Sequence, residues 1–314
     1  MKQRIYINDV AVRDGFQIER NFIPTETKIA LIDSLSDTGI AKIEVTSFVH
    51  PKLVPNMADA AEVLAHIKRV AGVNYSVLVP NVKGMERAIA THQGDGKINE
   101  INVVLSASET HNRANVNRTC EESFADFAVM INMAKDAGIR MNGTVSTSFG
   151  CPFEGYVPEA RVLGFAQRYV ELGFEGVTLA DTTGMANPAQ VERMSAEAVK
   201  RFPGLPLTLH FHNTRGMGLA NVLAGIRAGI VHYDGSLAGL GGCPFAPGAT
   251  GNICTEDMVN MLEDMDFDTG VDLDLLLAAA VKMPMVVGHD VPGQVMRAGK
   301  TLHLHPVPDK LYTQ

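Results

Sequence analysis

Short apolar runs alternate with longer amphipathic stretches along most of the chain. The runs are rich in Val, Ile and Leu and predict eight strands, near residues 4–11, 42–48, 74–80, 100–107, 140–147, 176–181, 207–212 and 232–238. A pattern of helical period follows each run and predicts helices near residues 25–37, 57–70, 83–91, 120–137, 157–171, 187–201, 216–228 and 254–265. The alternation therefore predicts a repeated strand–helix unit.

Four of the helix-to-strand joints share one local pattern, in which a glycine is followed by Ile or Phe and then by a strand. The glycines are Gly39, Gly138, Gly173 and Gly229. A glycine in the left-handed conformation commonly ends a helix, and the apolar residue after it packs back on that helix. Eight such units in about 265 residues fit a (β/α)8 TIM barrel. An open, doubly wound sheet is the alternative, and it fits less well because the units run on without a domain break.

Residues 1–270 are expected to form the barrel catalytic domain, and residues 271–314 a C-terminal helical extension packed on the barrel. Within the extension, the stretch DLDLLLAAAVKMPMVVG (272–288) predicts one helix. The prolines of the later stretch HLHPVP argue against a rigid strand there, so the end of the chain is expected to be irregular.

Charge and cysteine usage narrow the function classes. The 314 residues carry a formal net charge of −8 with no basic stripe, which argues against nucleic acid and anionic membranes as partners. The four cysteines include no CxxC pair, and a chain of this length needs no disulfide framework. No signal peptide and no apolar run of membrane length stands out, so a cytoplasmic protein is expected.

Polar residues collect where the predicted strands end, which is where a barrel of this kind places its chemistry. Ser, Thr and Asn commonly end strands and cap helices, so most of these residues need no further explanation. That ordinary role does not account for Arg13 and Asp14 after the first strand, or for His210 and His212 in the seventh.

The two histidines stand two positions apart in a strand and therefore share one face of it. Each could be a hydrogen-bonded core residue, or both could bind one metal ion. Asp14 can supply an oxygen ligand from a nearby strand. Two imidazoles and a carboxylate suit a divalent ion of the Mg, Mn, Fe, Co or Zn group.

The segment GLGGCPFAPGATGN (239–252) contains five glycines and a cysteine, Cys243. It lacks the pattern of a phosphate-binding loop. One interpretation is a linker with an inert thiol. The other is a loop that closes over the metal site and carries a proton donor.

Several of these stretches resemble the 3-hydroxy-3-methylglutaryl-CoA lyases, members of a superfamily of metal-dependent barrel lyases and Claisen-type condensing enzymes. The resemblance runs over roughly residues 4 to 285, and the glycine loop is its most specific element. It is carried by VAVRDGFQIE, IEVTSFVHPKLVPNMAD, GCPFEG, LADTTG, HFHNT and AGLGGCPFAPGATGNICTEDMVNMLE.

The resemblance implies a set of roles in a divalent-metal site that takes Mg²⁺ or Mn²⁺. The metal ligands would be Asp14, His210, His212 and Asn252. Arg13 would contact the thioester oxygen, and Cys243 would be the catalytic loop thiol. The residues that line the site or orient its ligands would be Gln17, Glu44, Thr144, Asp181 and Thr182. The resemblance also implies an acyl-CoA substrate, a homodimer or higher homo-oligomer, and a place in leucine degradation.

The residues suit retro-Claisen cleavage of a 3-hydroxyacyl-CoA, with acetyl-CoA and acetoacetate as the products of the parent activity. A base must take the hydroxyl proton, and His210 or Asp14 can do so. Arg13 can stabilise the enolate charge that develops on the thioester oxygen. Cys243 can protonate the enolate carbon. Asp14, Arg13, His210 and Cys243 are therefore the predicted catalytic residues.

Several positions depart from the pattern of the family, and they concern the acyl substrate more than the cleavage chemistry. They are Asn213, Arg215 and Met217 after the second histidine, Thr144 toward the end of the fifth strand, and His50 and Leu53 after the second strand. A related substrate such as citramalyl-CoA is one alternative. A condensing enzyme that uses acetyl-CoA is another, although such enzymes usually carry a regulatory domain. A non-catalytic metal- or CoA-binding protein is the third, and the joint presence of Arg13, Asp14, both histidines and Cys243 argues against it.

Overall fold

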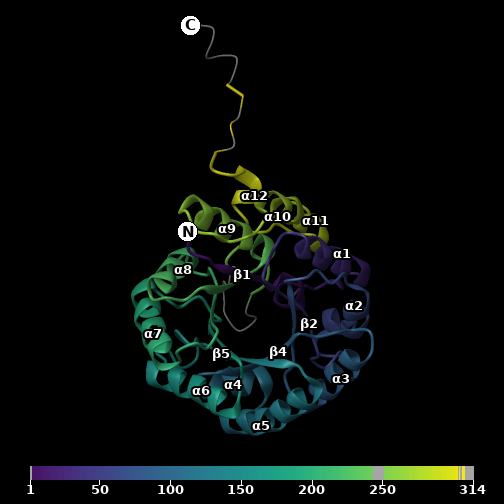
Figure 1. Ribbon diagram of the computed structural model, residues 1–314, viewed down its shortest axis with the longest axis vertical. Coiled ribbons are helices and arrows are strands. Elements are labelled where there is room, and N and C mark those ends of the chain that lie inside the picture. The colour runs from purple at the N-terminus through teal and green to yellow at the C-terminus, as the bar shows by residue number, and fades with distance from the viewer. Residues whose placement is uncertain (1, 243–250, 303, 305, 308–314) are drawn as a thin grey trace.

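The computed structural model describes residues 2–242, 251–302, 304, 306 and 307. Within this part, parallel strands close into one barrel in which each strand pairs with the next and the last pairs with the first (Figure 1). The strands are β1 (Tyr6–Asp9), β2 (Lys42–Ser47), β3 (Asn74–Leu78), β4 (Glu100–Ser106), β5 (Arg140–Ser146), β6 (Gly176–Asp181), β7 (Leu207–Phe211) and β8 (His232–Gly235). The predicted barrel is confirmed, and the open-sheet alternative is wrong.

Helices surround the barrel as an outer ring (Figure 1). They are α1 (Thr25–Ser36), α2 (Ala60–His66), α3 (Val82–Gln93), α4 (Glu109–Val116), α5 (Cys120–Ala137), α6 (Glu159–Leu172), α7 (Pro188–Arg201), α8 (Gly218–Arg227) and α9 (Thr255–Asp264). Gly138 and Gly173 end α5 and α6 in the left-handed conformation, as the joint pattern predicts. A short helix, α4, was not predicted, and α2 ends at His66, four residues before the expected boundary.

The segment 272–288 forms two helices, α10 (Leu273–Ala280) and α11 (Met283–Val287), so the prediction of a single helix is wrong. Pro284 explains the break, because it has no N–H to donate to the carbonyl of Ala280. With α12 (Val295–Ala298), these helices gather beside α1 and α9 (Figure 1). The division of the chain at residue 270 stays a prediction.

The first strand also ends earlier than predicted. It stops at Asp9, and residues 11–15 form one wide helical turn. The Oδ1 of Asp9 accepts a hydrogen bond from the backbone N–H of Ala11 at 2.9 Å, which turns the chain at this point. Arg13 and Asp14 therefore reach the barrel mouth from a turn after β1 and not from the strand itself.

The barrel interior is unusually polar for this fold, whose inner layers are ordinarily Val, Ile and Leu. Its side chains pair across neighbouring or nearby strands, through hydrogen bonds from Asn8 to Asp234 (2.8 Å), Asn102 to Glu44 (2.7 Å), Asn142 to Thr178 (3.0 Å) and Lys42 to Glu100 (2.6 Å). The apolar residues of the same strands point outward to the helices, as Ile101, Val103 and Leu105 do on β4. The hydrophobic core of the molecule is thus the layer between barrel and helices.

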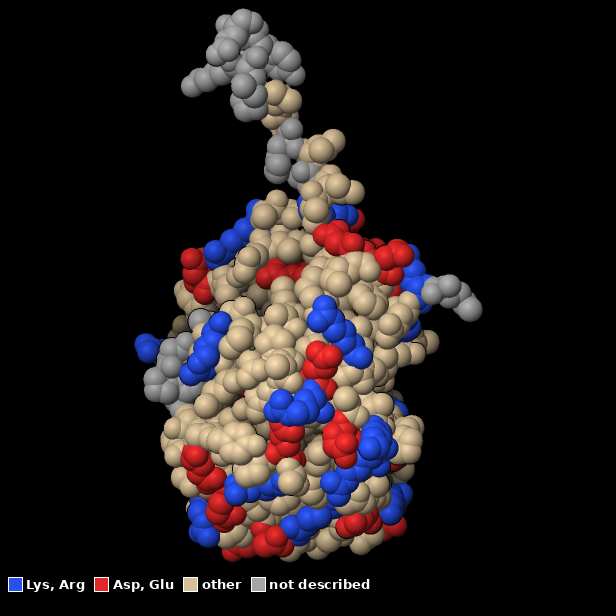
Figure 2. Space-filling view, turned by 90° about the vertical axis from the view of Figure 1, so that its left-hand side faces the viewer, with Lys and Arg blue, Asp and Glu red and all other residues tan. Residues whose placement is uncertain are grey.

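The surface agrees with the charge pattern of the sequence. Acidic and basic side chains are interspersed on the face that Figure 2 shows, without a stripe of one sign there. Among the described residues, no helix combines the length and the apolar character that a membrane crossing requires.

Tight packing behind β5 makes a prediction about stability. A Cβ atom at Gly143 would lie 2.5 Å from the ring of Tyr169, which is fully buried against Phe124, Phe127 and Phe174. Gly143→Ala should therefore lower the free energy of unfolding by roughly 1–3 kcal/mol, as overpacking of a core does. Thermal denaturation followed by circular dichroism measures the effect.

Gly164 in α6 is the matched control, because a Cβ there meets no atom within 4 Å. Gly164→Ala should stabilise the protein by up to about 1 kcal/mol, since glycine is unfavourable inside a helix. A Gly143→Ala variant as stable as the parent protein would contradict the packing argument.

Candidate active site

A cavity of about 600 Å³ opens at the C-terminal ends of the strands. The predicted site residues that line it are Arg13, Asp14, Gln17, Glu44, Thr144, Thr182, His210 and His212, together with His50 and Leu53 from the loop after β2. Asp181 lies behind the cavity wall. Its backbone carbonyl accepts from the N–H of His212 at 3.3 Å, and its carboxylate accepts from the N–H of Met185 at 2.7 Å. Gly242 also lines the cavity, and Cys243 lies outside the described residues.

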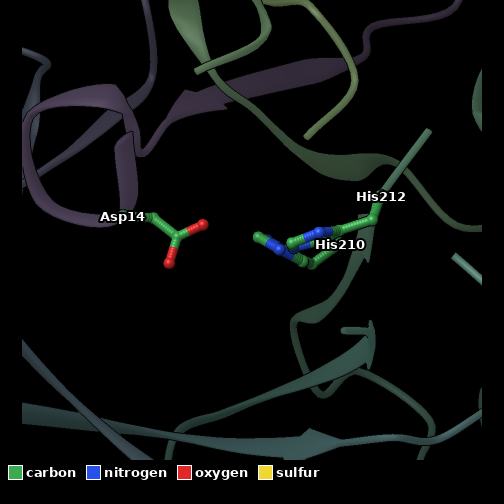
Figure 3. A group of neighbouring side chains, drawn as sticks. All are labelled: Asp14, His210 and His212. Atoms are coloured by element: carbon green, nitrogen blue, oxygen red, sulfur yellow. The ribbon is translucent and has the colours of Figure 1, made fainter. Parts of the chain in front are cut away.

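Asp14, His210 and His212 converge on one point. Their candidate ligand atoms all lie within 4.8 Å of one another, and the two imidazole centroids are 5.2 Å apart. Figure 3 shows the rings of His210, in β7, and of His212, just after it, directed toward the carboxylate of Asp14. The prediction that the two histidines share a face is confirmed, and the arrangement is suited to a single ion.

Asn252 lies beside this cluster. Its backbone forms an antiparallel bridge with His212, and its Nδ2 donates to Oδ2 of Asp14 at 2.7 Å and to the carbonyl of Leu240 at 3.0 Å. An amide that donates through its nitrogen keeps its oxygen as the atom that can accept a cation. The ligand role of Asn252 stays a prediction.

Arg13 is held by two carboxylates. Its Nε donates to Glu44, and its Nη1 donates to Oδ1 of Asp14 at 2.7 Å. Asn102 donates to the other oxygen of Glu44 and so fixes the carboxylate that holds the guanidinium of Arg13. Burial works to lower the pKa of Arg13, but the ionised Glu44 and Asp14 outweigh it and raise that pKa. Arg13 is therefore a permanent, oriented cation in the cavity wall.

The ionisation of Asp14 and His212 suits a metal site, whereas Asp234 outweighs burial and raises the pKa of His210. Burial alone would raise the pKa of Asp14, but Arg13 and the two imidazoles hold it below its ordinary value. Burial, with His210 beside it, lowers the pKa of His212 to about 3. Asp14 is thus a carboxylate and His212 a neutral imidazole at neutral pH, which are the forms that bind cations. The Nδ1 of His212 is buried and has no hydrogen-bond partner among the described residues, and such a nitrogen is suited to bind a cation.

Asp234 on β8 is a site residue that the sequence reasoning missed. It lines the cavity, and its Oδ2 lies 3.3 Å from Nδ1 of His210. Asn102 was missed as well. Strand alternation could have placed both on the inward face of the barrel, but the pairing of Asp234 with His210 depends on the register between strands.

A second acidic cluster, Cys254, Glu256 and Asp257, is buried at the start of α9. The carboxylate of Asp257 accepts from the backbone N–H groups of Gln294 and Val295, and Oε2 of Glu256 accepts from that of Ala238 at 3.0 Å. Burial raises the pKa of Glu256 to about 8. These acids are engaged in holding α9 to the segments around it, so the first cluster is the better metal site.

Comparison with known proteins gives one consistent result. The model of the HMGL-like family matches residues 4–282. The hydroxymethylglutaryl-CoA lyase of Bacillus subtilis is 44% identical, over 95% of this chain and 98% of that protein. The mitochondrial hydroxymethylglutaryl-CoA lyase of Homo sapiens is 42% identical, over 89% of this chain and 84% of that protein.

Solved structures give the same picture. An HMG-CoA lyase from Acinetobacter baumannii, in complex with coenzyme A and 3-methylmalate, has a TM-score of 0.92 and 48% identity, and the match covers 97% of this chain and 98% of that one. The HMG-CoA lyase structure from Bacillus subtilis has a TM-score of 0.89 and 44% identity, covering 94% and 98% of the two chains.

The raised pKa of Glu256 predicts a pH dependence of stability. A carboxyl group whose pKa is about 8 when folded and 4.5 when unfolded binds more protons in the folded state between these values. Stability should therefore be fully present below about pH 4.5 and fall as the pH rises toward about 8. Glu256→Gln should flatten this fall. Melting temperatures of both proteins at about pH 5 and about pH 8.5 measure it, and a parallel fall in both would show that Glu256 is not the titrating group.

Proposed function

The chain belongs to the HMGL-like family, and from that membership we propose that it is a divalent-metal-dependent carbon–carbon lyase that cleaves hydroxymethylglutaryl-CoA to acetyl-CoA and acetoacetate. One observation carries the proposal. Asp14, His210, His212 and Arg13 converge on a single cavity at the barrel mouth, in a chain that hydroxymethylglutaryl-CoA lyases match nearly from end to end.

The metal would be held by Asp14, His210, His212 and Asn252. The geometry of the first three supports this assignment, as does Nδ1 of His212, which has no hydrogen-bond partner within the described part of the chain. Mg²⁺ or Mn²⁺ suits the mixture of oxygen and imidazole donors without a thiolate among them. A divalent ion bound there would polarise the oxygens of the substrate and make its hydroxyl group more acidic.

The protein's own groups would then move the protons. His210 or Asp14 takes the proton of the 3-hydroxyl group, the bond between C2 and C3 breaks, and the electron pair passes to the thioester as an enolate. Arg13 stabilises that negative charge at the thioester oxygen, because Glu44 and Asp14 hold its guanidinium in place and no reorganisation is needed. Protonation of C2 completes acetyl-CoA, and the former hydroxyl carbon becomes the ketone of acetoacetate.

Cys243 is the proposed donor of the proton to C2. It follows Gly242, which lines the cavity, and a thiol is a stronger acid than a hydroxyl group. Cys120, Cys151 and Cys254 are buried, and burial raises the pKa of Cys120 to about 12 and that of Cys254 further still. The described cysteines are therefore poorly suited to this step.

Gln17, Thr144 and Thr182, with His50 and Leu53, are proposed to surround the acyl group, since all of them line the cavity. Asp181 is proposed to act from behind through the backbone of His212. A second candidate substrate is a related 3-hydroxyacyl-CoA such as citramalyl-CoA. The Acinetobacter baumannii relative, solved with coenzyme A and the branched hydroxy diacid 3-methylmalate, favours keeping this alternative.

The setting of the enzyme is part of the proposal. We propose an acyl-CoA as substrate, a homodimer or higher homo-oligomer, a cytoplasmic location and a place in leucine degradation. These accord with the lyase activity and with the free thiols of Cys120, Cys151 and Cys254.

The experiment that tests the function is an assay of acetyl-CoA release from a panel of 3-hydroxyacyl-CoA thioesters, before and after removal of divalent metal with a chelator. Hydroxymethylglutaryl-CoA should be cleaved, the activity should disappear with the metal, and Mg²⁺ or Mn²⁺ should restore it. Preference for another thioester would select the second candidate. Condensation of acetyl-CoA with an oxo acid, without cleavage of any thioester in the panel, would overturn the proposal.

Replacement of Arg13 tests its role. Arg13→Met should lower kcat by roughly a hundredfold or more, because the charge acts mainly on the developing enolate, while Mn²⁺ affinity should change little. The kcat of Arg13→Lys should lie between those of the parent protein and Arg13→Met. Lysine keeps the charge but lacks the planar guanidinium that reaches Glu44 and Asp14 together. An Arg13→Met variant that keeps more than about a tenth of the parent rate would show that another group stabilises the enolate.

A further inference from the structure

Asp234 stands in a row of polar residues that crosses four neighbouring strands at one level of the barrel. The pairing register sets Lys42 opposite Asn8, Asn8 opposite Asp234, and Asp234 opposite His210. These residues come from β2, β1, β8 and β7. The register of the backbone therefore brings Asp234 beside His210 on one side and Asn8 on the other.

Each oxygen of Asp234 has its own partner. Oδ1 accepts from Nδ2 of Asn8 at 2.8 Å, and Oδ2 lies 3.3 Å from Nδ1 of His210. An ionised carboxylate can only accept hydrogen bonds, so the imidazole must present an N–H at Nδ1. Asp234 is therefore a hydrogen-bond acceptor held from two sides, by Asn8 and by His210.

The two histidines of the cluster differ in this respect. His210 has the carboxylate of Asp234 at Nδ1, whereas Nδ1 of His212 has no hydrogen-bond partner among the described residues. A neutral imidazole that carries its proton on Nδ1 has its lone pair on Nε2. Of these two histidines, only His210 has its tautomer selected by another side chain of the described structure.

We propose that Asp234 is the positioning residue of His210: by accepting the hydrogen bond from Nδ1, with Asn8 holding its other oxygen, it turns the ring and leaves Nε2 unprotonated toward Asp14. This inference rests on the proposed metal site. A carboxylate behind a ligating imidazole fixes its tautomer and increases its basicity, and the loss of such a partner commonly weakens metal binding about 10- to 100-fold.

The substitution Asp234→Asn tests the proposal. Asn8 already donates to one oxygen at position 234, so the new amide should keep its oxygen toward Asn8 and turn its NH₂ group toward His210. That donor would favour the tautomer with the proton on Nε2, the nitrogen needed for the metal. Mn²⁺ affinity, measured by electron paramagnetic resonance of the free ion, should fall roughly 10- to 100-fold. In the metal-free protein, ¹⁵N shifts of the His210 ring should show the proton moving from Nδ1 to Nε2.

Glu100→Gln is the matched control. Glu100 is also a carboxylate of the barrel interior, its side chain is 12% exposed against 13% for Asp234, and it pairs with Lys42 and not with a histidine. Its Mn²⁺ affinity should stay within about twofold of the parent value, because the ring of His210 keeps its partner.

The double variant Asn8→Asp with Asp234→Asn exchanges the two groups. An aspartate at position 8 can only accept, so it should draw the NH₂ of the new amide away from His210 and turn the amide oxygen toward Nδ1. Most of the lost affinity and the original tautomer should return. If Asp234→Asn alone does not fold, this double variant carries the test, because it keeps one carboxylate and one amide in the pair.

The outcomes distinguish the role of Asp234 from the existence of the metal site. Unchanged Mn²⁺ affinity in Asp234→Asn, an equal loss in Glu100→Gln, or a folded double variant without recovery would each overturn the role of Asp234 alone. A parent protein that binds no Mn²⁺ would overturn the proposed metal site, and the role of Asp234 with it.

Discussion

A buried polar side chain inside a closed barrel must find its partner on another strand, and this requirement organises the whole site. Water is largely excluded there, so an unpaired amide or carboxylate would cost on the order of 1–3 kcal/mol. The interior side chains form hydrogen bonds with side chains of other strands, as Asn102 does with Glu44 and Asn8 with Asp234. The proposed site therefore lies above a layer of hydrogen-bonded polar side chains. In most barrels of this fold, branched aliphatic side chains fill that layer.

Charged side chains at the mouth of the barrel are also paired with one another. Arg13 lies between Glu44 and Asp14, so a cation and two anions occupy a small volume without a large net charge. The deeper pair of Lys42 and Glu100 repeats the arrangement one layer below. Buried charges of this kind contribute little to stability, but they hold groups rigidly where reacting charge develops. The barrel interior thus contains polar pairs in place of stabilising apolar packing, and these pairs hold the charged groups of the site in fixed positions.

The sequence predicted the parts of the molecule that local patterns control. The glycine–apolar joints and the apolar runs located the eight strands, and the spacing of His210 and His212 placed both rings on one face. Cross-strand register could not be predicted, because it depends on closure of the ring; Asp234 was therefore missed although its sequence position is ordinary. The turn that carries Arg13 and Asp14 was not predicted, since its cause is a contact between Asp9 and a nearby backbone N–H.

The contact between Asn8 and Asp234 joins the first strand to the last, which ties assembly of the site to completion of the fold. A chain with only part of the ring formed would leave Asp234 without Asn8, and Asp14 far from His210 and His212. Such partly folded forms would lack the proposed metal site, and a ligand that binds only the native state stabilises that state. Closure of the barrel and occupation of the proposed site would then be coupled equilibria, each favouring the other.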